Sequence, residues 1–178
     1  MMAGLGDIER RAYPLEVRAK GSHLEGYAAT FDTEAKIGRL RERIAGGAFA
    51  ASLRTGGDIL ALLDHDPGKV LGRTRSTSLR LAEDSRGLAF ELDLPDTQAG
   101  RDVRALAERG DLGGMSFGFL AKGDSWQGDL RTLTAVDLKE ISVVSAWPAY
   151  EGTSVALRSL AASGRERRRR QILLAGRW

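Results

Sequence analysis

The stretch Gly87-Leu88-Ala89-Phe90-Glu91-Leu92-Asp93-Leu94 decides the fold class of this chain. Leucine and phenylalanine recur at every second position, which is the period of a β-strand with one buried face. A polar turn at residues 83–86 precedes this run, and residues 70–81 before the turn also alternate polar and apolar side chains. The two runs therefore predict a β-hairpin whose first strand is long and bent.

Further strands are predicted on both sides of this hairpin. They cover residues 23–31, 59–64, 112–121 and 130–145. The last two of these strands predict a second hairpin, turned at residues 123–128. Residues 32–47 mix charges with glycines and are expected to form a loop with a short helical piece.

Two helices are predicted between the strands. Residues 48–53 form a short apolar helical segment that the Gly56-Gly57 pair can end. A longer helix follows the first hairpin, where Asp96 or Thr97 can cap it and Gly110 can end it. Because strands dominate, the sequence favours a mainly β fold with flanking helices (α+β), an antiparallel barrel or sandwich, over an alternating α/β sheet.

Composition excludes several classes of protein. The 178 residues suit one domain, and 42% hydrophobic with 29% charged residues is a folded, globular composition. No run reaches the roughly 18 apolar residues that a membrane-spanning helix needs, and charges within residues 1–11 speak against a signal peptide. Cysteine is absent, so disulfides, thiolate metal sites and cysteine nucleophiles are excluded. With only His23 and His65 as imidazoles, a metal site would need carboxylates from separate loops, so none is expected.

Charge divides the chain into a body and a tail. Residues 158–178 hold seven arginines and one glutamate, a net charge of +6, whereas the rest of the chain holds 20 basic and 23 acidic residues, a net charge of −3. We therefore expect one domain at residues 1–157, with a core at about 12–155, and a basic C-terminal tail. Such a tail indicates an appended interaction or address segment, not a nucleic-acid-binding domain.

The first candidate for chemistry is Ser116, which lies in the glycine-rich run Gly113-Gly114-Met115-Ser116-Phe117-Gly118-Phe119. Glycines let a substrate backbone approach and expose N–H groups to a developing oxyanion. The spacing also matches the nucleophile elbow of α/β-hydrolases, but that fold needs a histidine after the serine, and none follows His65. The alternative is a small residue in a tightly packed strand.

His65 and Glu140 are the other two candidates. His65 lies where an apolar strand meets a turn, so it could be a general base or a hydrogen-bonded turn histidine beside two acids. By the period of a strand, Glu140 shares one face with Leu138, Ser142 and Val144. A carboxylate on an otherwise apolar face is costly unless it is paired or hydrogen-bonded. The alternative places Glu140 on a solvated face, with Ile141 and Val143 facing inward.

Together, a serine, a histidine and a carboxylate are the minimal set for acyl transfer. If Glu140 is the third member, the chain order of His65, Ser116 and Glu140 matches neither chymotrypsin nor subtilisin. The carboxylate could instead come from one of three aspartates, Asp58, Asp93 or Asp102.

Seven short motifs along residues 25–155 carry a resemblance to a known family. They are Glu25-Gly26-Tyr27-Ala28-Ala29-Thr30-Phe31, Ile44-Ala45-Gly46-Gly47-Ala48-Phe49 with Ser52-Leu53, Leu62-Leu63-Asp64-His65-Asp66, Leu71-Gly72-Arg73, Gly114-Met115-Ser116-Phe117-Gly118-Phe119, Leu138-Lys139-Glu140-Ile141-Ser142-Val143-Val144 and Pro148-Ala149-Tyr150. In this order and spacing they resemble the prohead (procapsid maturation) proteases of tailed phages. The chain departs from the family at Ala45 and Gly46, where the family often has a proline before Gly47.

The resemblance implies a serine endopeptidase on an antiparallel β-barrel of the herpesvirus-protease-like type. By matching motifs, the resemblance assigns the role of nucleophile to Ser116, of general base to His65 and of orienting carboxylate to Glu140. Backbone N–H groups near Gly113 and Gly114, or an arginine, would receive the oxyanion. The herpesvirus relatives use a second histidine as third member, but His23 does not match that place.

The resemblance also implies a biological setting. The enzyme would cleave the N-terminal scaffold segment of the major capsid (coat) protein, and itself, during procapsid maturation of a tailed phage, prophage or phage-derived particle. It would be a homo-oligomer without cofactor, membrane or specific nucleic acid, inside the procapsid in the cytoplasm of the bacterial host. The rival interpretation is a catalytically inactive capsid-assembly protein on the same barrel, and a non-proteolytic esterase is a further one. The tail would be a solvated helix, or a detachable packaging segment trimmed near residues 161–164.

Overall fold

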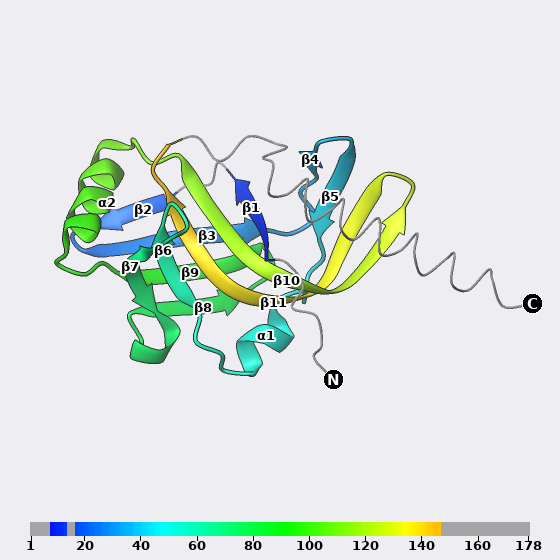
Figure 1. Ribbon diagram of the computed structural model, residues 1–178, viewed down its shortest axis with the longest axis horizontal. Coiled ribbons are helices and arrows are strands. Elements are labelled where there is room, and N and C mark those ends of the chain that lie inside the picture. Colours follow the sequence, from blue (N-terminus) through cyan, green and yellow to red (C-terminus); the bar gives the residue numbers. More distant parts are fainter. Residues whose placement is uncertain (1–7, 14–16, 147–178) are drawn as a thin grey trace, which may run out of the picture.

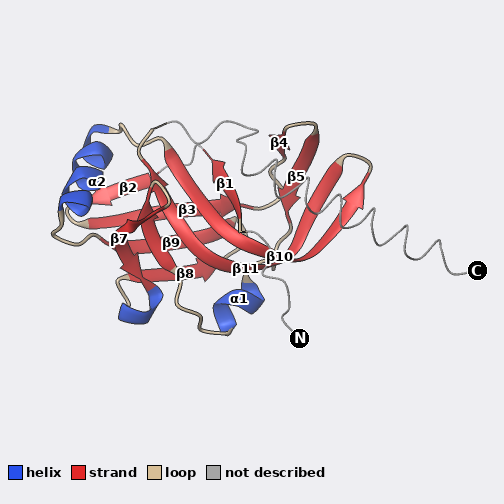
Figure 2. Ribbon diagram, viewed as in Figure 1, coloured by secondary structure: helices blue, strands red, loops and turns tan. Residues whose placement is uncertain are grey.

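The strands of this protein form two β-sheets, with the helices at their margins (Figures 1 and 2). The computed structural model describes residues 8–13 and 17–146. The basic tail at residues 158–178 and the Pro148-Ala149-Tyr150 motif lie outside the described residues.

The smaller sheet contains the hairpin predicted from residues 87–94. Its four antiparallel strands lie in the order β2 (Val17–Lys20), β3 (His23–Thr30), β9 (Gly87–Asp93) and β8 (Leu79–Glu83). The hairpin is confirmed, because β8 pairs with β9 from Leu79 opposite Leu92 to Glu83 opposite Leu88. In Figure 1 these strands run across the back of the larger sheet.

The larger sheet has seven strands and centres on a long hairpin. Its main path is β1 (Glu9–Tyr13), β10 (Gly114–Gln127), β11 (Leu130–Val144), β5 (Leu40–Ile44) and β4 (Ala35–Ile37). Two further strands, β6 (Leu60–Leu63) and β7 (Asp66–Arg73), pair with each other, and β6 also pairs with β11.

The expected antiparallel barrel is wrong, because the described strands form open sheets and the larger one is mixed. At 15 residues, β11 is long enough to pair in parallel with two short strands in succession. Its residues 130–133 pair with β5, and its residues 140–143 pair with β6. Between those two pairings, α1 (Ala50–Arg54) and the segment before it cover the strand edge.

Among the individual elements, the longer predicted helix is confirmed, and the predictions for residues 70–81, residues 32–47 and the second turn are wrong. The predicted helix after the first hairpin is α2 (Gln98–Arg109), with Thr97 as its N-cap and Gly110 as its C-cap. The predicted long strand at 70–81 is two strands in different sheets, β7 and β8, separated by the 3-10 turn η1 (Thr74–Ser76). The expected loop at 32–47 contains β4 and β5, and the second hairpin turns at Gly128 because β10 continues to Gln127.

Strand alternation on β10 separates the core from the candidate site. Met115, Phe117 and Phe119 are fully buried in one apolar cluster with residues of both sheets. Phe117 and Phe119 stack with ring centroids 5.1 Å apart. Because successive strand residues point to opposite faces, Ser116 and Gly118 lie on the other face of β10.

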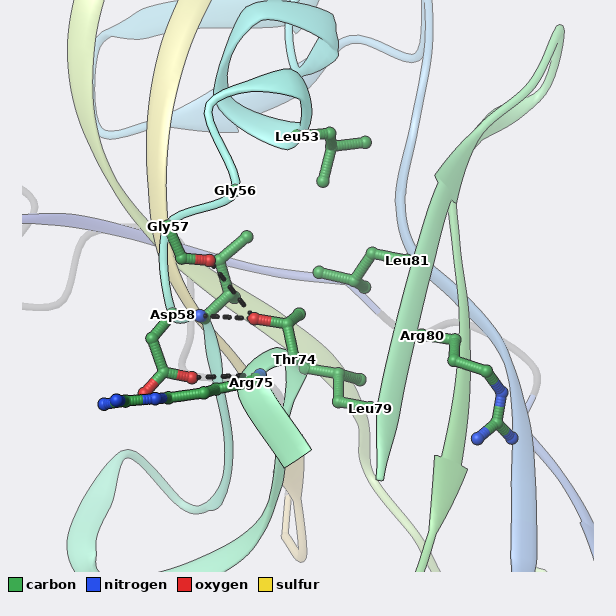
Figure 3. Close-up of a pocket in the computed structure, with 10 residues that line it drawn as sticks. Leu53, Gly56, Gly57, Asp58, Thr74, Arg75, Leu79, Arg80 and Leu81 are labelled. Carbon is green, nitrogen blue, oxygen red and sulfur yellow. Dashed lines mark hydrogen bonds between the residues drawn. The ribbon is translucent and has the colours of Figure 1, made fainter. Parts of the chain in front are cut away.

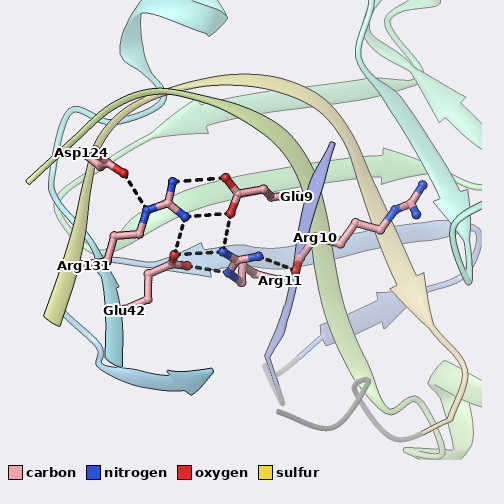
Figure 4. Close-up of polar contacts among 6 residues, drawn as sticks. All are labelled: Glu9, Arg10, Arg11, Glu42, Asp124 and Arg131. Atoms are coloured by element: carbon pink, nitrogen blue, oxygen red, sulfur yellow. Dashed lines mark hydrogen bonds and ion pairs between the residues drawn. The ribbon is translucent and has the colours of Figure 1, made fainter. Parts of the chain in front are cut away.

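A buried cluster of charged side chains joins β1 to the rest of the larger sheet (Figure 4). Glu42 of β5 accepts hydrogen bonds from Arg11 Nε at 2.5 Å and from Arg131 at 3.1 Å. Glu9 also accepts from both arginines, at 2.7 Å each, and Asp124 accepts from Arg131 Nε at 2.8 Å. Burial raises the pKa of Glu9, but the hydrogen bonds and charges of Arg131 and Arg11 outweigh it and hold that pKa below its ordinary value.

Helix α1 and the turn before it accept hydrogen bonds from backbone N–H groups of β11. Val136 N–H donates to the Ala48 carbonyl at 2.9 Å, and Leu138 N–H donates to the buried Ser52 Oγ at 2.9 Å. The Ser52 hydroxyl therefore supports β11 two residues before Glu140.

Replacing Ser52 with alanine should lower the free energy of unfolding by about 1–3 kcal/mol, because it leaves the Leu138 N–H buried without a partner. Ser76→Ala is the matched control: its hydroxyl is exposed and bonds locally, so the change should stay within about 0.5 kcal/mol. Urea unfolding of the three proteins measures both effects. Equal stability of the two variants would contradict this role for Ser52.

Candidate active site

Strand register brings the candidate serine and carboxylate to one face of the larger sheet. Ser116 of β10 lies directly opposite Ala12 of β1 and Ser142 of β11; we call these three the Ser116 row. Two residues along β10, Gly118 lies opposite Arg10 and Glu140, which form the Glu140 row. Directly opposite residues in antiparallel strands point to the same side, so the two rows are neighbours on one face.

His65 reaches this face from the end of β6. Both Asp64 and His65 adopt left-handed backbone conformations, with φ of 52° and 59°. The Asp64 carboxylate fastens the turn by accepting hydrogen bonds from the Ser145 N–H at 2.8 Å and the Ser145 hydroxyl at 2.5 Å. Because β6 pairs with β11 as far as Leu63 opposite Val143, the turn places the imidazole beside Glu140 and Ser142.

The His65 ring makes two contacts through the same nitrogen. Nδ1 lies 2.6 Å from Glu140 Oε1 and 3.1 Å from Ser142 Oγ. A carboxylate only accepts hydrogen bonds, so we assign the imidazole proton to Nδ1. That tautomer leaves a lone pair on Nε2, which is the arrangement a general base needs.

Glu140 is nearly buried and remains ionised. Desolvation by burial raises the pKa of this carboxyl, but the hydrogen bonds from His65 and Arg10 outweigh it, so the pKa lies below its ordinary value. Arg10 Nε donates to Oε1 at 3.0 Å, the same oxygen that faces His65. Ile141 and Val143 do face the core, yet Glu140 on the opposite face is paired and only 7% exposed.

Ser116 lies beside this pair and is fully buried. Its Oγ has no hydrogen-bond partner within the described part of the chain, so the structure shows no direct bond to His65. Directly opposite side chains lie about 4.5–5.5 Å apart at Cβ, which puts Ser116 next to Ser142, itself in contact with the imidazole. Unliganded hydrolases often hold nucleophile and base loosely in this way.

The other candidates for the third member lie elsewhere. Asp58 binds Arg73, and Asp102 binds Gln98. Asp93 accepts a hydrogen bond from His23 at 2.9 Å in the smaller sheet. The second histidine of the chain therefore pairs with this aspartate, away from Ser116. Of these alternatives and Glu140, the structure brings only Glu140 into contact with His65.

The two glycines expected at the oxyanion site differ in availability. Gly113 N–H donates to the Val144 carbonyl at 2.9 Å, so this group is already used in the sheet. Gly114, the first residue of β10, has a φ of 146°, which other residues rarely adopt. The Gly113 N–H is therefore engaged in the sheet in this conformation, and Gly114 stays a candidate donor on the sequence argument alone.

Sequence reasoning did not single out Ser142 and Arg10. Ser142 could have been found, because it follows Glu140 by two residues on the same strand face. Nothing in the sequence indicates Arg10, because Glu140 lies 130 residues away in the chain and their contact depends on how β1 pairs with the hairpin of β10 and β11.

A hollow of about 620 Å³ lies at the opposite end of β6 from His65 (Figure 3). Leu53 and Leu81 line it, with Asp58 and Arg75 near the turn η1. It is separate from the site at His65. Among the described residues no group of His, Cys, Asp or Glu is placed to hold a metal ion, and no described helix is long and apolar enough to cross a membrane.

Comparison with known proteins places the chain in a family. The model of the caudovirus prohead serine protease family matches residues 10–166. The chain belongs to this family. The match includes His65, Ser116 and Glu140, and it confirms the resemblance that the seven motifs indicated.

A solved structure supports the fold of this prohead protease family member. The chain is similar to the capsid assembly protease gp21 of bacteriophage T4, with a TM-score of 0.51 and 12% sequence identity. The comparison covers 77% of this chain and 95% of gp21. At this identity the likeness shows the fold alone. Among curated proteins no match was found.

Proposed function

We propose that this protein is a serine endopeptidase in which Ser116 is the nucleophile, His65 the general base and Glu140 the orienting carboxylate. The contact of His65 Nδ1 with Glu140 at 2.6 Å, on the face that carries Ser116, is the observation that carries the proposal. Membership of a family of serine proteases supports it.

The proposed mechanism is acyl transfer. Ser116 Oγ attacks the peptide carbonyl while His65 Nε2 takes its proton, and Glu140 stabilises the imidazolium that forms. The N–H of Gly114, or an arginine, receives the oxyanion. His65 then gives its proton to the leaving amine. In the second step a water molecule attacks the acyl-enzyme while His65 takes the water proton, and His65 returns that proton to Ser116 Oγ when the acid product leaves. Because Ser116 is fully buried, the chain around it opens before a peptide reaches it.

The proposed substrate is the N-terminal scaffold segment of the coat protein, with the protease itself as a second substrate. The setting is a procapsid in the bacterial cytoplasm, where the protease domain at residues 1–157 acts as a homo-oligomer and the basic tail serves packaging. The family description, a prohead protease, supports this setting. Co-expression with the coat protein of the same genome tests it, since intact mass should show the coat protein shortened at its N-terminus.

The second candidate is a catalytically inactive assembly protein. The absence of a hydrogen bond between the buried Ser116 Oγ and His65, within the described residues, is the observation that favours it. In that case the coat protein would assemble in the presence of the protein and keep its full mass.

Replacing Glu140 with glutamine should lower kcat by about 10²- to 10⁴-fold, less than the loss of the nucleophile, because an orienting group contributes less than the group that reacts. Asp93→Asn is the matched control, since Asp93 holds the other histidine at a similar distance, and kcat should stay within about twofold. Peptide cleavage by the three proteins measures both effects. A larger loss for Asp93→Asn would move the third role away from Glu140.

A further inference from the structure

We propose that Gly118 and Arg10 are positioning residues for Glu140. Gly118 leaves open the space in which the carboxylate lies, and Arg10 reaches over it from the edge strand to hold the carboxylate in place. The inference rests on the proposed function, because it concerns how the Glu140 carboxylate is oriented toward His65, the proposed general base.

The register of three strands carries the first step. Arg10 of β1, Gly118 of β10 and Glu140 of β11 lie directly opposite one another. Neighbouring strands are about 4.8 Å apart, so the outer two residues are separated by roughly 10 Å at the backbone. Their side chains nevertheless meet, with Arg10 Nε 3.0 Å from Glu140 Oε1. Such a contact across a strand requires two long side chains with little between them.

Gly118 supplies the space for that contact. A Cβ atom at this position would lie 2.7 Å from Glu140 Cγ and 2.9 Å from Oε1, closer than such atoms approach in proteins. Its backbone is not in the left-handed region, unlike that of Gly114, so alanine causes no backbone strain there. The cost of a side chain at Gly118 therefore falls on the position of the Glu140 carboxylate.

Arg10 holds the oxygen that faces the imidazole. Glu140 Oε1 receives both His65 Nδ1 at 2.6 Å and Arg10 Nε at 3.0 Å, so two donors fix one atom. Figure 4 shows the Arg10 side chain leaving β1 on the side opposite to the buried cluster of Glu9 and Arg11. That cluster holds β1 against the larger sheet and thereby fixes the backbone position from which the Arg10 side chain extends to Glu140.

Kinetics of four variants test the proposal. Gly118→Ala should lower kcat by about ten- to a hundredfold with KM within about twofold, because a misplacement of about 1 Å near the reacting groups can cost about a hundredfold in rate. Arg10→Met should lower kcat by about three- to tenfold, and Arg10→Lys, which keeps the charge, should restore most of that loss. Gly123→Ala is the control on the same strand. The atom nearest to its Cβ would be Thr134 Oγ1 at 2.9 Å, so it brings a similarly close contact, but with a side chain away from the site.

A double-mutant cycle separates positioning of Glu140 from a general effect on the strand. In the Glu140→Ala background no carboxylate is left to displace, so adding Gly118→Ala should change kcat by less than about twofold. The proposal would be overturned if Gly118→Ala lowered kcat in the Glu140→Ala background by the same factor as in the parent protein. It would also be overturned if the Gly118→Ala protein kept the kcat of the parent.

Proton NMR of the imidazole gives a readout that does not depend on proteolysis. The hydrogen-bonded His65 Nδ1 proton should give a far-downfield resonance that Gly118→Ala shifts and Gly123→Ala leaves in place. An unchanged resonance in Gly118→Ala would contradict the positioning role. If Ser116→Ala still cleaved peptides while this resonance moved as expected, the proposed function would fail and the positioning role would stand.

Discussion

Replacing Ser116 with alanine is expected to abolish cleavage of the coat protein, with kcat falling by about 10⁴-fold or more, because the reaction loses its nucleophile. The fold should be unaffected, since the Ser116 hydroxyl makes no hydrogen bond among the described residues and its removal breaks none. Co-expression with the coat protein followed by intact-mass measurement reads out cleavage, and circular dichroism checks the fold.

Ser142→Ala is the matched control for this prediction. Both serines are fully buried and lie directly opposite each other, and Ser142 is the one in contact with His65. That contact is to Nδ1, the nitrogen that also binds Glu140, so Ser142 is placed to orient the ring and not to lose a proton to it. The Ser142 variant should therefore keep measurable cleavage. An inactive Ser142→Ala protein beside an active Ser116→Ala protein would rule out Ser116 as the nucleophile.

The largest effect on stability is expected at Glu42. This fully buried carboxylate holds both Arg11 and Arg131, so Glu42→Ala leaves two buried guanidinium groups with too few acceptors. Breaking a buried ion pair by removing one partner costs about 3–5 kcal/mol, and we expect a loss of this size in urea unfolding.

Glu34→Ala provides the comparison for Glu42. Glu34 pairs with Arg41, the neighbour of Glu42 on β5, but both side chains are more than 40% exposed, so the free energy of unfolding should fall by less than about 1 kcal/mol. Similar losses for the two variants would show that the buried cluster does not stabilise the joining of β1 to the sheet.

The cluster around Glu42 also explains why the sequence misled about residues 32–47. A strand with one buried face normally alternates apolar and polar residues, but β5 reads Leu40-Arg41-Glu42-Arg43-Ile44 and buries the glutamate at its centre. Its partner Arg131 lies 89 residues away, and no local sequence pattern indicates that the two side chains pair. The strand at residues 87–94 was predictable because its buried residues are apolar and its partner is next in the chain.

The candidate site was predictable in its residues and not in its geometry. Ser116, His65 and Glu140 stand out because their chemistry is unusual for their local sequence. The use of Gly118 as space for a carboxylate, and of Arg10 as its second donor, follows from a register that joins β1, β10 and β11. The mixed sheet has the same origin, since β11 takes two parallel partners at different points along its length.

Labelling with a fluorophosphonate, followed by peptide mapping, shows whether Ser116 is the nucleophile. The probe is applied to a preparation that cleaves the coat protein, and the same treatment is applied to His65→Ala. We expect one covalent adduct on Ser116 that appears as cleavage is lost, and no adduct in His65→Ala. An adduct on Ser142 instead, or full loss of cleavage without modification of Ser116, would contradict this role of Ser116.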